Sequence, residues 1–386
     1  MKTSVYRISD ICSIKSGKRL PAGTDFSCEP TPYRYIRSRD IKGGKISLED
    51  VAYIDEETKE KIKKYIINSG DIAITIVANI GDIGYATQEC DGINLTENAV
   101  RLTCFDEKHV YSKYLAYYLR QDSMKSYMEG LSVGAAQAKL GIYKIEKIKL
   151  QLPLVDIQKS ISSIIEKYES LIEANNKRIK VLEQMAENLY KEWFVRFRFP
   201  GHETAEFENG LPKGWRTEKL KTIADFQYGK MPSQEHVVDN GYPIYTGYRT
   251  SGYYDSFLYE KPMLLVIARG VGGTGDVKIS PPKVFITNLS IVILLKNPEL
   301  LMYYLYQLFQ LHNLRYLDSG AAQSQITIED LQRVRIILPD NSTLMKYSNA
   351  YLPISNEIHL LEEKNTNLIK QRDLLLPRMM SGKQEV

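Results

Sequence analysis

Two stretches of the chain carry a heptad pattern of apolar residues. The spaced positions, separated by alternating steps of four and three residues, run from Ile161 to Trp193 and again from Tyr347 to Met379. This spacing places apolar side chains on one stripe of a helix that can pair with a second helix. The pattern predicts two long helices, each of about 33 residues and roughly 50 Å in length. Pro353 lies inside the second pattern and lacks a backbone N–H, so we expect that helix to start or kink there.

The two long helices are predicted to pair with each other as an antiparallel coiled coil. When the two patterns are centred on each other, a positions face d positions, and Asn175 faces Asn365. A buried asparagine pair can fix the register of a coiled coil at some cost in stability. The alternative is two independent amphipathic helices whose asparagines face solvent. Replacing both asparagines with leucine and mapping the register by cross-linking distinguishes the two arrangements.

Ahead of each long helix, the apolar residues form shorter segments that are typical of strands. Apolar runs at 71–78 and 263–268, in regions punctuated by Gly and Pro, predict buried strands. A short helix is predicted after each of them, around 113–121 in the first half and 299–309 in the second. A Leu-Pro step then leads into each long helix.

The second half of the chain repeats the first. The tetrapeptide Gly-Ala-Ala-Gln at 134–137 returns at 320–323, an offset of 186 residues. Further pairs of segments match in the same order along the chain: 117–119 with 303–305, 152–153 with 338–339, the Gly-Lys steps 17–18 with 229–230, and the glycine-rich turns 80–84 with 271–275. An ordered series of matches does not arise by chance. The chain is therefore predicted to hold two copies of one unit.

The composition is that of a soluble globular protein with two domains or more. The chain has 386 residues, of which 43% are hydrophobic and 25% charged. No apolar run reaches the ~18 residues of a membrane helix, and the N-terminus lacks the apolar core of a signal peptide, so we expect a cytoplasmic location. The four cysteines form no C-x-x-C pair and the five histidines are scattered, which argues against a disulfide framework and a metal site.

The sequence carries no recognisable catalytic motif. It has no phosphate-binding P-loop, no nucleophile elbow and no convincing nuclease carboxylate cluster. The glycine cluster at 270–275 follows a strand-like run but precedes no predicted helix, and we interpret it as a tight turn. Ser-Pro-Pro-Lys at 280–283 lacks the Asn or Asp and the aromatic residue of an amino-methyltransferase loop. We therefore expect this chain to perform no catalysis itself.

The first fifty residues instead have the composition of a nucleic-acid surface. Residues 11–47 hold eight basic residues against three acidic ones, with Tyr33 and Tyr35 among the arginines. Arginine can bind guanine through two hydrogen bonds, and lysine contacts phosphates. The matching region of the second half has fewer charges and more tyrosines, so we expect the two halves to read different DNA sequences. The candidate DNA contacts are Lys18, Arg34, Arg37, Arg39, Asn79, Gln137 and Lys139 in the first half, and Lys230, Tyr245, Arg249, Arg269, Gln323 and Gln325 in the second.

Several motifs together resemble those of the specificity (S) subunits of type I restriction-modification systems. They are the duplicated Gly-x-x-Gln turn before Leu-Pro and a long helix, the segment Trp-Phe-Val-Arg-Phe-Arg-Phe-Pro-Gly at 193–201, the restart Leu-Pro-Lys-Gly-Trp at 211–215, and the tail at 372–382. The resemblance covers essentially the whole chain. It implies an α+β fold in which two similar target-recognition domains, β-rich and mixed α/β, are separated by the antiparallel coiled coil and related by a pseudo-two-fold internal repeat.

The resemblance also implies domain boundaries and partners. The implied segments are target-recognition domains at 1–153 and 215–339, spacer helices at 154–195 and 340–386 (the latter with the C-terminal tail), and a linker at 196–214. Each domain would read one half of a split, asymmetric site in double-stranded DNA. The coiled coil would dock two adenine-N6 methyltransferase subunits, which restriction/translocase subunits then join. S-adenosylmethionine, ATP and Mg are expected on those partners, and no cofactor on this chain.

Two other classes of protein stay open on the sequence alone. One is a coiled-coil adaptor that joins two protein-binding modules, and the other is a self-sufficient DNA methyltransferase or nuclease with an unrecognised site. Binding that is insensitive to salt would favour the adaptor, because phosphate contacts make DNA affinity fall steeply with salt. Methylation or cleavage by the isolated chain would favour the enzyme.

Overall fold

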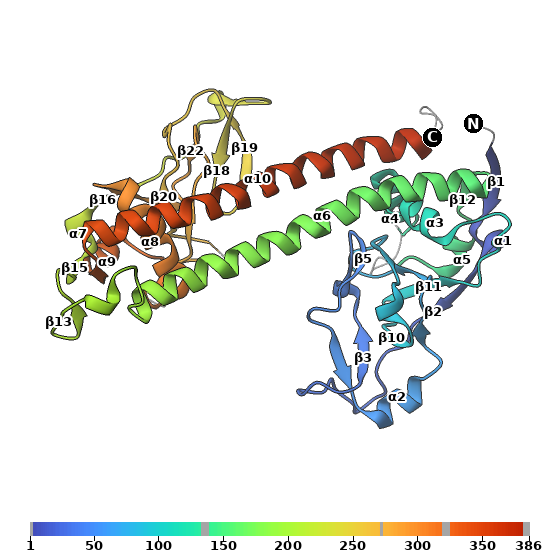
Figure 1. Ribbon diagram of the computed structural model, residues 1–386. Coiled ribbons are helices and arrows are strands. Elements are labelled where there is room, and N and C mark those ends of the chain that lie inside the picture. The colour runs from blue at the N-terminus through green and yellow to red at the C-terminus, as the bar shows by residue number, and fades with distance from the viewer. Residues whose placement is uncertain (1–2, 133–138, 271–272, 319–324, 381–386) are drawn as a thin grey trace. The chain divides into compact units, whose positions relative to one another are not determined.

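The computed structural model describes residues 3–132, 139–270, 273–318 and 325–380. The chain forms two compact units, which we call unit 1 (residues 1–173 with 365–386) and unit 2 (residues 174–364). Each unit contains two larger sheets, several short helices and segments of two long helices (Figure 1). This mixture of helix and sheet, repeated along the chain, confirms the predicted fold class.

Unit 1 contains a six-stranded sheet in the order β2-β11-β8-β9-β5-β4 and a four-stranded sheet in the order β6-β3-β10-β7. The strands of the larger sheet are β2 (Ser13–Ser16), β4 (Ile41–Lys42), β5 (Gly44–Ile46), β8 (Ile72–Thr75), β9 (Ile83–Tyr85) and β11 (Ala99–Thr103). Those of the smaller sheet are β3 (Tyr33–Ile36), β6 (Ala52–Ile54), β7 (Ile66–Ile67) and β10 (Ile93–Leu95). A separate antiparallel pair joins β1 (Thr3–Arg7) to β12 (Lys149–Pro153). The short helices are α1 (Ile8–Ile11), α2 (Glu56–Ile62), α3 (Ser112–Leu119), α4 (Asp122–Leu131) and α5 (Ile142–Glu146), with 3-10 turns η1 (Ser38–Asp40) and η2 (Gln88–Cys90).

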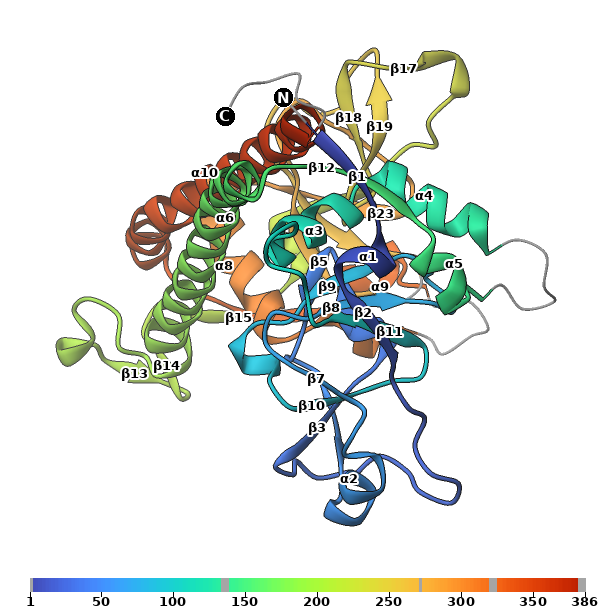
Figure 2. The ribbon, with the colours of Figure 1, turned by 90° about the vertical axis from the view of Figure 1, so that its right-hand side faces the viewer.

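The core of unit 1 lies between the larger sheet, α3 and the start of the long helix α6 (Val155–Tyr190), as Figure 2 shows. Ile72 of β8, Leu115 of α3 and Ile161 of α6 are all fully buried in this core. All residues of β8 are buried, as expected of a continuous apolar run whose two faces are both covered. The strand predicted at 71–78 and the helix predicted at 113–121 are thereby confirmed.

Unit 2 contains two four-stranded sheets, in the orders β16-β23-β20-β21 and β17-β19-β18-β22. The strands of the first are β16 (Ala224–Tyr228), β20 (Leu264–Ile267), β21 (Val277–Ile279) and β23 (Ser290–Leu295), and those of the second are β17 (Val237–Val238), β18 (Tyr242–Tyr245), β19 (Thr250–Tyr254) and β22 (Phe285–Ile286). Two antiparallel pairs are β13 (Phe207–Glu208) with β14 (Leu211–Pro212), and β15 (Arg216–Lys219) with β24 (Arg335–Leu338). The short helices are α7 (Leu220–Ile223), α8 (Pro298–Leu311) and α9 (Ile328–Arg333), with 3-10 turns η4 (His202–Thr204), η5 (Gln234–His236) and η6 (Leu314–Leu317).

The two units share one topology, which confirms the internal repeat. The antiparallel pair β1–β12 corresponds to β15–β24, and the parallel pair β3–β10 corresponds to β18–β22. The hairpin β8–β9 corresponds likewise to β20–β21. Unit 1 has an added hairpin β4–β5, which extends its larger sheet by pairing with β9. The second sheets also differ at their outer strands, because β7 pairs with β10 in unit 1 and β17 pairs with β19 in unit 2.

The segment predicted as a linker is folded around one tryptophan. The π-helical turn η3 (Lys191–Val195) follows α6, and the ring centroids of Phe194, Phe197 and Phe199 lie 5.7, 5.6 and 5.3 Å from that of Trp215. Aromatic pairs at these distances contribute beyond the area that they bury. The aromatic segment at 193–201 and the Trp-containing restart at 211–215 therefore form one structural element of unit 2.

The long helices α6 and α10 (Asn341–Met380) run antiparallel within each unit, as predicted. In unit 2 the ring centroid of Trp193 lies 5.8 Å from that of Tyr347, which is one of the pairs expected from the centred register. Arg178 also forms an ion pair across the two helices with Glu357, at 2.9 Å. Asn175 and Asn365 belong to different units, and their pairing stays a prediction.

Helix α10 begins at Asn341 and continues through Pro353, so it does not start at the proline, and the alternative of a kink there stays a prediction. The turns before the proline are held by Leu344 and Tyr347, which are buried in the core of unit 2. Pro353 itself is exposed, so water can solvate the carbonyl group that the missing N–H leaves free. Burial of the first turns therefore outweighs the local preference of the proline.

Asp340 caps the N-terminus of α10. Its carboxylate accepts hydrogen bonds from the backbone N–H groups of Ser342 and Thr343, at 2.9 and 3.0 Å, and from the indole N–H of Trp215, at 3.2 Å. The first N–H groups of a helix have no partner within the helix, and the helix dipole favours negative charge there. Asp340 therefore explains why α10 begins well upstream of the proline.

Replacing Asp340 with alanine should lower the free energy of unfolding of unit 2 by about 1–2 kcal/mol at neutral pH. Burial disfavours the charged carboxyl, but the hydrogen bonds from Thr343, Ser342 and Trp215 outweigh it and hold the pKa of Asp340 below its usual value. Because the folded-state pKa is lowered, this stabilisation is present above the unfolded-state pKa and is lost as the pH falls through the folded-state pKa. Urea denaturation at neutral and acidic pH should show a difference between wild type and variant that shrinks in acid. An equal difference at both pH values would contradict a role for the charge.

Candidate nucleic-acid interface

In each unit, three equivalent chain segments meet at one end of the strands of one sheet, which is the six-stranded sheet in unit 1 and the β16-β23-β20-β21 sheet in unit 2. In unit 1, antiparallel pairing places the ends of β2 and β8 beside the start of β11. In unit 2, it places the ends of β16 and β20 beside the start of β23. We call these surfaces the recognition edges. They comprise residues 17–19, 76–79, 96–98 and 139–140 in unit 1, and residues 229–231, 268–270, 287–289 and 325–326 in unit 2.

The two recognition edges are built on the same backbone hydrogen bonds. Four bonds of unit 1 have direct counterparts in unit 2, all between 2.8 and 3.1 Å. The pairs of N–H to O bonds are Gly17–Ala99 with Gly229–Ser290, Lys18–Leu95 with Lys230–Ile286, Ile76–Asn98 with Ala268–Leu289, and Leu140–Ile76 with Ile326–Ala268. The residues that these bonds join therefore have structural equivalents in the other unit.

Gly17 and Gly229 let the Gly-Lys steps approach the neighbouring turn. A Cβ atom on Gly17 would lie 2.0 Å from the carbonyl oxygen of Thr96, and one on Gly229 would lie 2.2 Å from that of Thr287. No side chain fits at either position. The match between the two Gly-Lys steps, predicted from the sequence, is confirmed.

Candidate contacts of unit 1 lie on its recognition edge. Lys18, Asn79 and Lys139 are exposed. The backbone of Lys139 pairs with that of Val77 in an isolated antiparallel bridge, and the amino group of Lys18 lies 5.6 Å from the ring centroid of Tyr65. The edge therefore brings together cationic and amide groups from segments far apart in the sequence.

Candidate contacts of unit 2 lie on the equivalent edge. Lys230 and Arg269 are exposed and Gln325 is half-buried. Arg269 and Gln325 pair through their backbones, in the bridge that corresponds to Val77–Lys139. Lys230 also lines a shallow hollow of about 500 Å³, whose walls include the rings of Tyr254 and Phe285.

The chain matches a known family over most of its length. The family described as type I restriction modification DNA specificity domain matches residues 2–184 and 212–344. The chain belongs to this family. It is a specificity subunit, the non-catalytic DNA-recognition component of a type I restriction-modification system, which confirms the predicted function class.

Similar proteins match most of this chain. The specificity subunit of the type I restriction enzyme MjaIX from Methanocaldococcus jannaschii is 25% identical over 359 residues, which cover 86% of this chain and 82% of the relative. The putative MjaX specificity subunit of the same organism is 25% identical over 377 residues, or 91% and 87% of the two chains. Among solved structures, the S subunit of a type I restriction-modification system from M. genitalium superposes with a TM-score of 0.66 at 15% identity, over 98% of this chain and 96% of that one.

The specificity subunit uses some of its candidate arginines internally. Arg37 donates two hydrogen bonds of 3.1 Å to the buried carboxylate of Asp40, and only 21% of its side chain is exposed. Arg39 pairs with Asp50 at 2.7 Å, but both side chains are largely exposed, so this ion pair is weak and easily released. Arg34 is exposed on β3. Of these three arginines, Arg34 and Arg39 are thus the more accessible to DNA.

Two candidates of unit 2 lie outside the edge. Tyr245 on β18 is half-buried and packs against the cluster that contains Leu265 and Ile286; burial, and then the charge of Glu362, raise its pKa. Arg249 is exposed just before β19, and its backbone N–H donates to the Thr246 side chain. Gln137 and Gln323 lie outside the described residues.

Sequence reasoning missed several residues of the recognition edges. Arg19 and Glu97 form an ion pair of 2.7 Å in unit 1, and their equivalents in unit 2 are Met231 and Asn288. Burial disfavours the charged form of Glu97, but the hydrogen bonds that its carboxylate accepts from Arg19, from its own backbone and from Thr96, with the charge of Arg19, together outweigh burial and lower its pKa. Asn98 likewise corresponds to Leu289. Spacing alone could not have found these pairs, because the offset that relates the two edges differs from one segment to the next.

The predicted match between the glycine-rich turns was shifted by three residues. The N–H of Gly81 donates to Thr75 O and the N–H of Gly275 donates to Ile267 O, so Gly81, rather than Gly84, is the equivalent of Gly275. The interpretation of the segment at 270–275 as a turn agrees with the described residues 273–275, which form a turn before β21. The turns differ in length, which is why the sequence comparison was misaligned.

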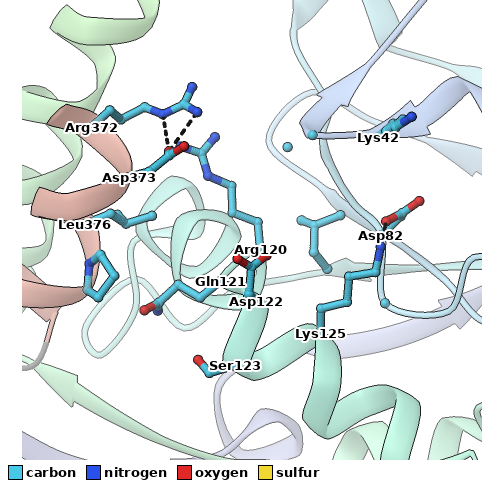
Figure 3. Close-up of a pocket in the computed structure, with 15 residues that line it drawn as sticks. Lys42, Asp82, Arg120, Gln121, Asp122, Ser123, Lys125, Arg372, Asp373 and Leu376 are labelled. Carbon is cyan, nitrogen blue, oxygen red and sulfur yellow. Dashed lines mark hydrogen bonds and ion pairs between the residues drawn. The ribbon is translucent and has the colours of Figure 1, made fainter. Parts of the chain in front are cut away.

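A cavity of about 590 Å³ in unit 1 lies apart from these contacts. It is lined by the turn of β4–β5, the turn of β8–β9, the α3–α4 junction and the end of α10. Figure 3 shows Lys125 directed toward Asp82, with a separation of 2.5 Å, and Arg372 bonded to Asp373. No candidate DNA contact lines this cavity, and these lining charges neutralise each other. We therefore assign it no role in recognition.

Other kinds of site receive no support from the part of the chain that the structure describes. Within it, no group of three or more His, Cys, Asp or Glu side chains is placed to hold a metal ion. None of its helices is long and apolar enough to span a bilayer.

Proposed function

We propose that this specificity subunit reads a bipartite, asymmetric site in double-stranded DNA, one half through each recognition edge. The observation that carries this proposal is one backbone framework that presents different side chains in the two units. A common framework suits the regular sugar-phosphate backbone, whereas different side chains suit different bases. The two half-sites should therefore differ in sequence.

The proposed contacts are the exposed candidates, of which Arg34, Arg39 and Arg249 lie outside the edges as defined above. In unit 1 they are Lys18, Arg34, Arg39, Asn79 and Lys139, and in unit 2 they are Lys230, Arg249, Arg269 and Gln325. Arg37 and Tyr245 would contribute only if they left their present partners. In this proposal the target-recognition domains are residues 1–153 and 215–339, with residues 154–195 and 340–386 forming the spacer.

The proposed partners follow from the family. The coiled coil would dock two adenine-N6 methyltransferase subunits, and restriction/translocase subunits would join them. S-adenosylmethionine, ATP and Mg would bind to those subunits and not to this chain. The complex would work in the cytoplasm, where its DNA substrate lies.

We expect the specificity subunit, expressed with its neighbouring methyltransferase in a methylation-free host, to direct N6-methyladenine to one two-part motif. The chain expressed alone should produce no methylation, because it belongs to the non-catalytic component. Sequencing that detects N6-methyladenine across the genome measures both results and spells out the half-sites. Methylation in both strains would reveal an unrecognised catalytic centre. Methylation in neither would favour the adaptor function.

A further inference from the structure

We propose that each recognition edge separates two tasks by position. Accessible positions at which the two edges carry the same residue contact the DNA backbone, and accessible positions at which they differ read bases. This inference rests on the proposed function and deepens it, because it assigns roles to individual residues. It depends on the structural equivalences of the two edges and not on their sequence alignment.

Lys18 and Lys230 occupy the constant position. Each follows a glycine that admits no side chain, and each donates its backbone N–H to the equivalent strand residue at 2.9 Å. Both side chains are exposed, so each ammonium group is accessible to DNA. An ammonium on a flexible stem suits a phosphate, which offers charge without base identity.

The strongest difference lies at the isolated bridge. The bridge pairs Val77 with Lys139 in unit 1, whereas it pairs Arg269 with Gln325 in unit 2. Arginine bonds guanine through two hydrogen bonds and glutamine does the same with adenine, whereas valine offers only apolar contact of the kind that suits the thymine methyl group. Unit 2 thus presents a guanine reader beside an adenine reader. Unit 1 instead has Val77, which is half-buried against the core of its unit, beside the exposed Lys139, which can bind guanine.

A second difference flanks the constant lysine. In unit 1 Arg19 is held by Glu97, and both side chains are charged. In unit 2 the equivalent of Arg19 is Met231, which is 76% exposed, and Leu289 nearby is 38% exposed. Exposed apolar side chains beside a cation suit base edges that carry methyl groups. The unit 2 half-site is therefore expected to be richer in thymine next to its guanine and adenine.

The test uses the full chain with its methyltransferase and compares three sets of variants. Lys18→Gln and Lys230→Gln change the constant position. V77R combined with K139Q gives unit 1 the bridge residues of unit 2, and R269V combined with Q325K makes the reverse change. Lys149→Gln on β12 and Arg335→Gln on β24 are matched controls, because they remove exposed cations at equivalent positions outside the edges. Thermal unfolding confirms that each variant folds.

Two measurements distinguish backbone contact from base reading. The first is the methylation motif across the genome. The second is the salt dependence of binding to DNA duplexes that carry either the mapped motif or the motif with one half scrambled. The constant-position variants should keep the motif and bind all duplexes more weakly. They should also reduce the slope of log affinity against log salt by about 0.9 for each phosphate that the lysine no longer neutralises. Each exchanged bridge should change one half of the motif and reduce affinity for the original half by at least tenfold. The controls should change neither quantity.

Opposite results would overturn the assignment. An altered motif in Lys18→Gln or Lys230→Gln would show that this lysine contacts bases. An unchanged motif in both folded bridge exchanges would show that the bridge residues do not contact bases. A wild-type complex that methylates no two-part motif would overturn the proposed function and this inference together. A wild-type motif with contrary variants would overturn only the inference.

Discussion

Replacing Gly17 with alanine will disrupt the recognition edge of unit 1 and leave that of unit 2 intact, and replacing Gly229 will do the reverse. The new Cβ atom would lie 2.0 Å from the carbonyl oxygen of Thr96 or 2.2 Å from that of Thr287. Because the obstacle is backbone, the Gly-Lys step itself must move away. Overpacking of this kind costs about 1–3 kcal/mol or more in stability. It also displaces Lys18 or Lys230 from its position on the edge.

Disruption of one edge should reduce DNA binding selectively. Each mismatched base pair in a specific site costs about 1–3 kcal/mol, so a protein that no longer reads one half-site should bind with at least about 100-fold lower affinity. The variant should then bind the intact target no better than a duplex in which that half is scrambled, while it still discriminates the other half. Gly130→Ala in α4 is the control, because a Cβ there meets nothing within 4 Å. Since alanine favours helix, this control should be neutral or stabilise by up to about 1 kcal/mol. If Gly17→Ala still discriminated both half-sites equally well, the proposal that the unit 1 recognition edge reads one half-site would be contradicted.

The large elements of the fold could be predicted because their signals are local. The heptads at 161–193 and 347–379 specify the long helices, and the continuous apolar runs specify β8 and β20. The repeat was also visible, because buried positions and tight backbone approaches such as Gly17 and Gly229 tolerate few residues. Where the backbone geometry allows only one residue type, as at these two glycines, that residue in the sequence predicts the geometry.

The recognition edges could not be predicted in detail because their partners are set by tertiary hydrogen bonds. Val77 became the equivalent of Arg269 only through the bridges to Lys139 and Gln325. Arg37 was a plausible base reader until the structure placed the carboxylate of Asp40 against it. Turn lengths that differ between the units also shifted the sequence alignment. The contacts of surface side chains are thus harder to predict from the sequence than the core that positions them.

The two units attach α3 and its equivalent α8 to the long helices by different chemistry. In unit 1 Glu169 of α6 accepts from Arg120 at 2.6 Å and from the Tyr117 hydroxyl at 2.9 Å, and Arg120 lies 4.6 Å from the centroid of the Tyr117 ring. In unit 2 the Tyr303 and Tyr351 rings stack at 4.8 Å. The attachment is ionic in one unit and aromatic in the other. Only the first should depend strongly on one charge.

Replacing Glu169 with glutamine should therefore destabilise unit 1 by about 3 kcal/mol, because Arg120 would keep its charge without its counter-ion. Only 12% of the Arg120 side chain and 18% of the Glu169 side chain are exposed, so water compensates little. Hydrogen exchange should show faster opening of α3 and of the start of α6, with the helices of unit 2 unchanged.

Glu166→Gln is the matched control on the same helix: its partner Lys113 is 30% exposed and Glu166 is 36% exposed, so that change should cost less than about 1 kcal/mol. If both variants opened equally, the bonds from Arg120 and Tyr117 to Glu169 would not be what holds α3 to α6. If only Glu169→Gln speeds the opening of α3 and of the start of α6, the buried charge of Glu169 is what holds these two helices together in unit 1.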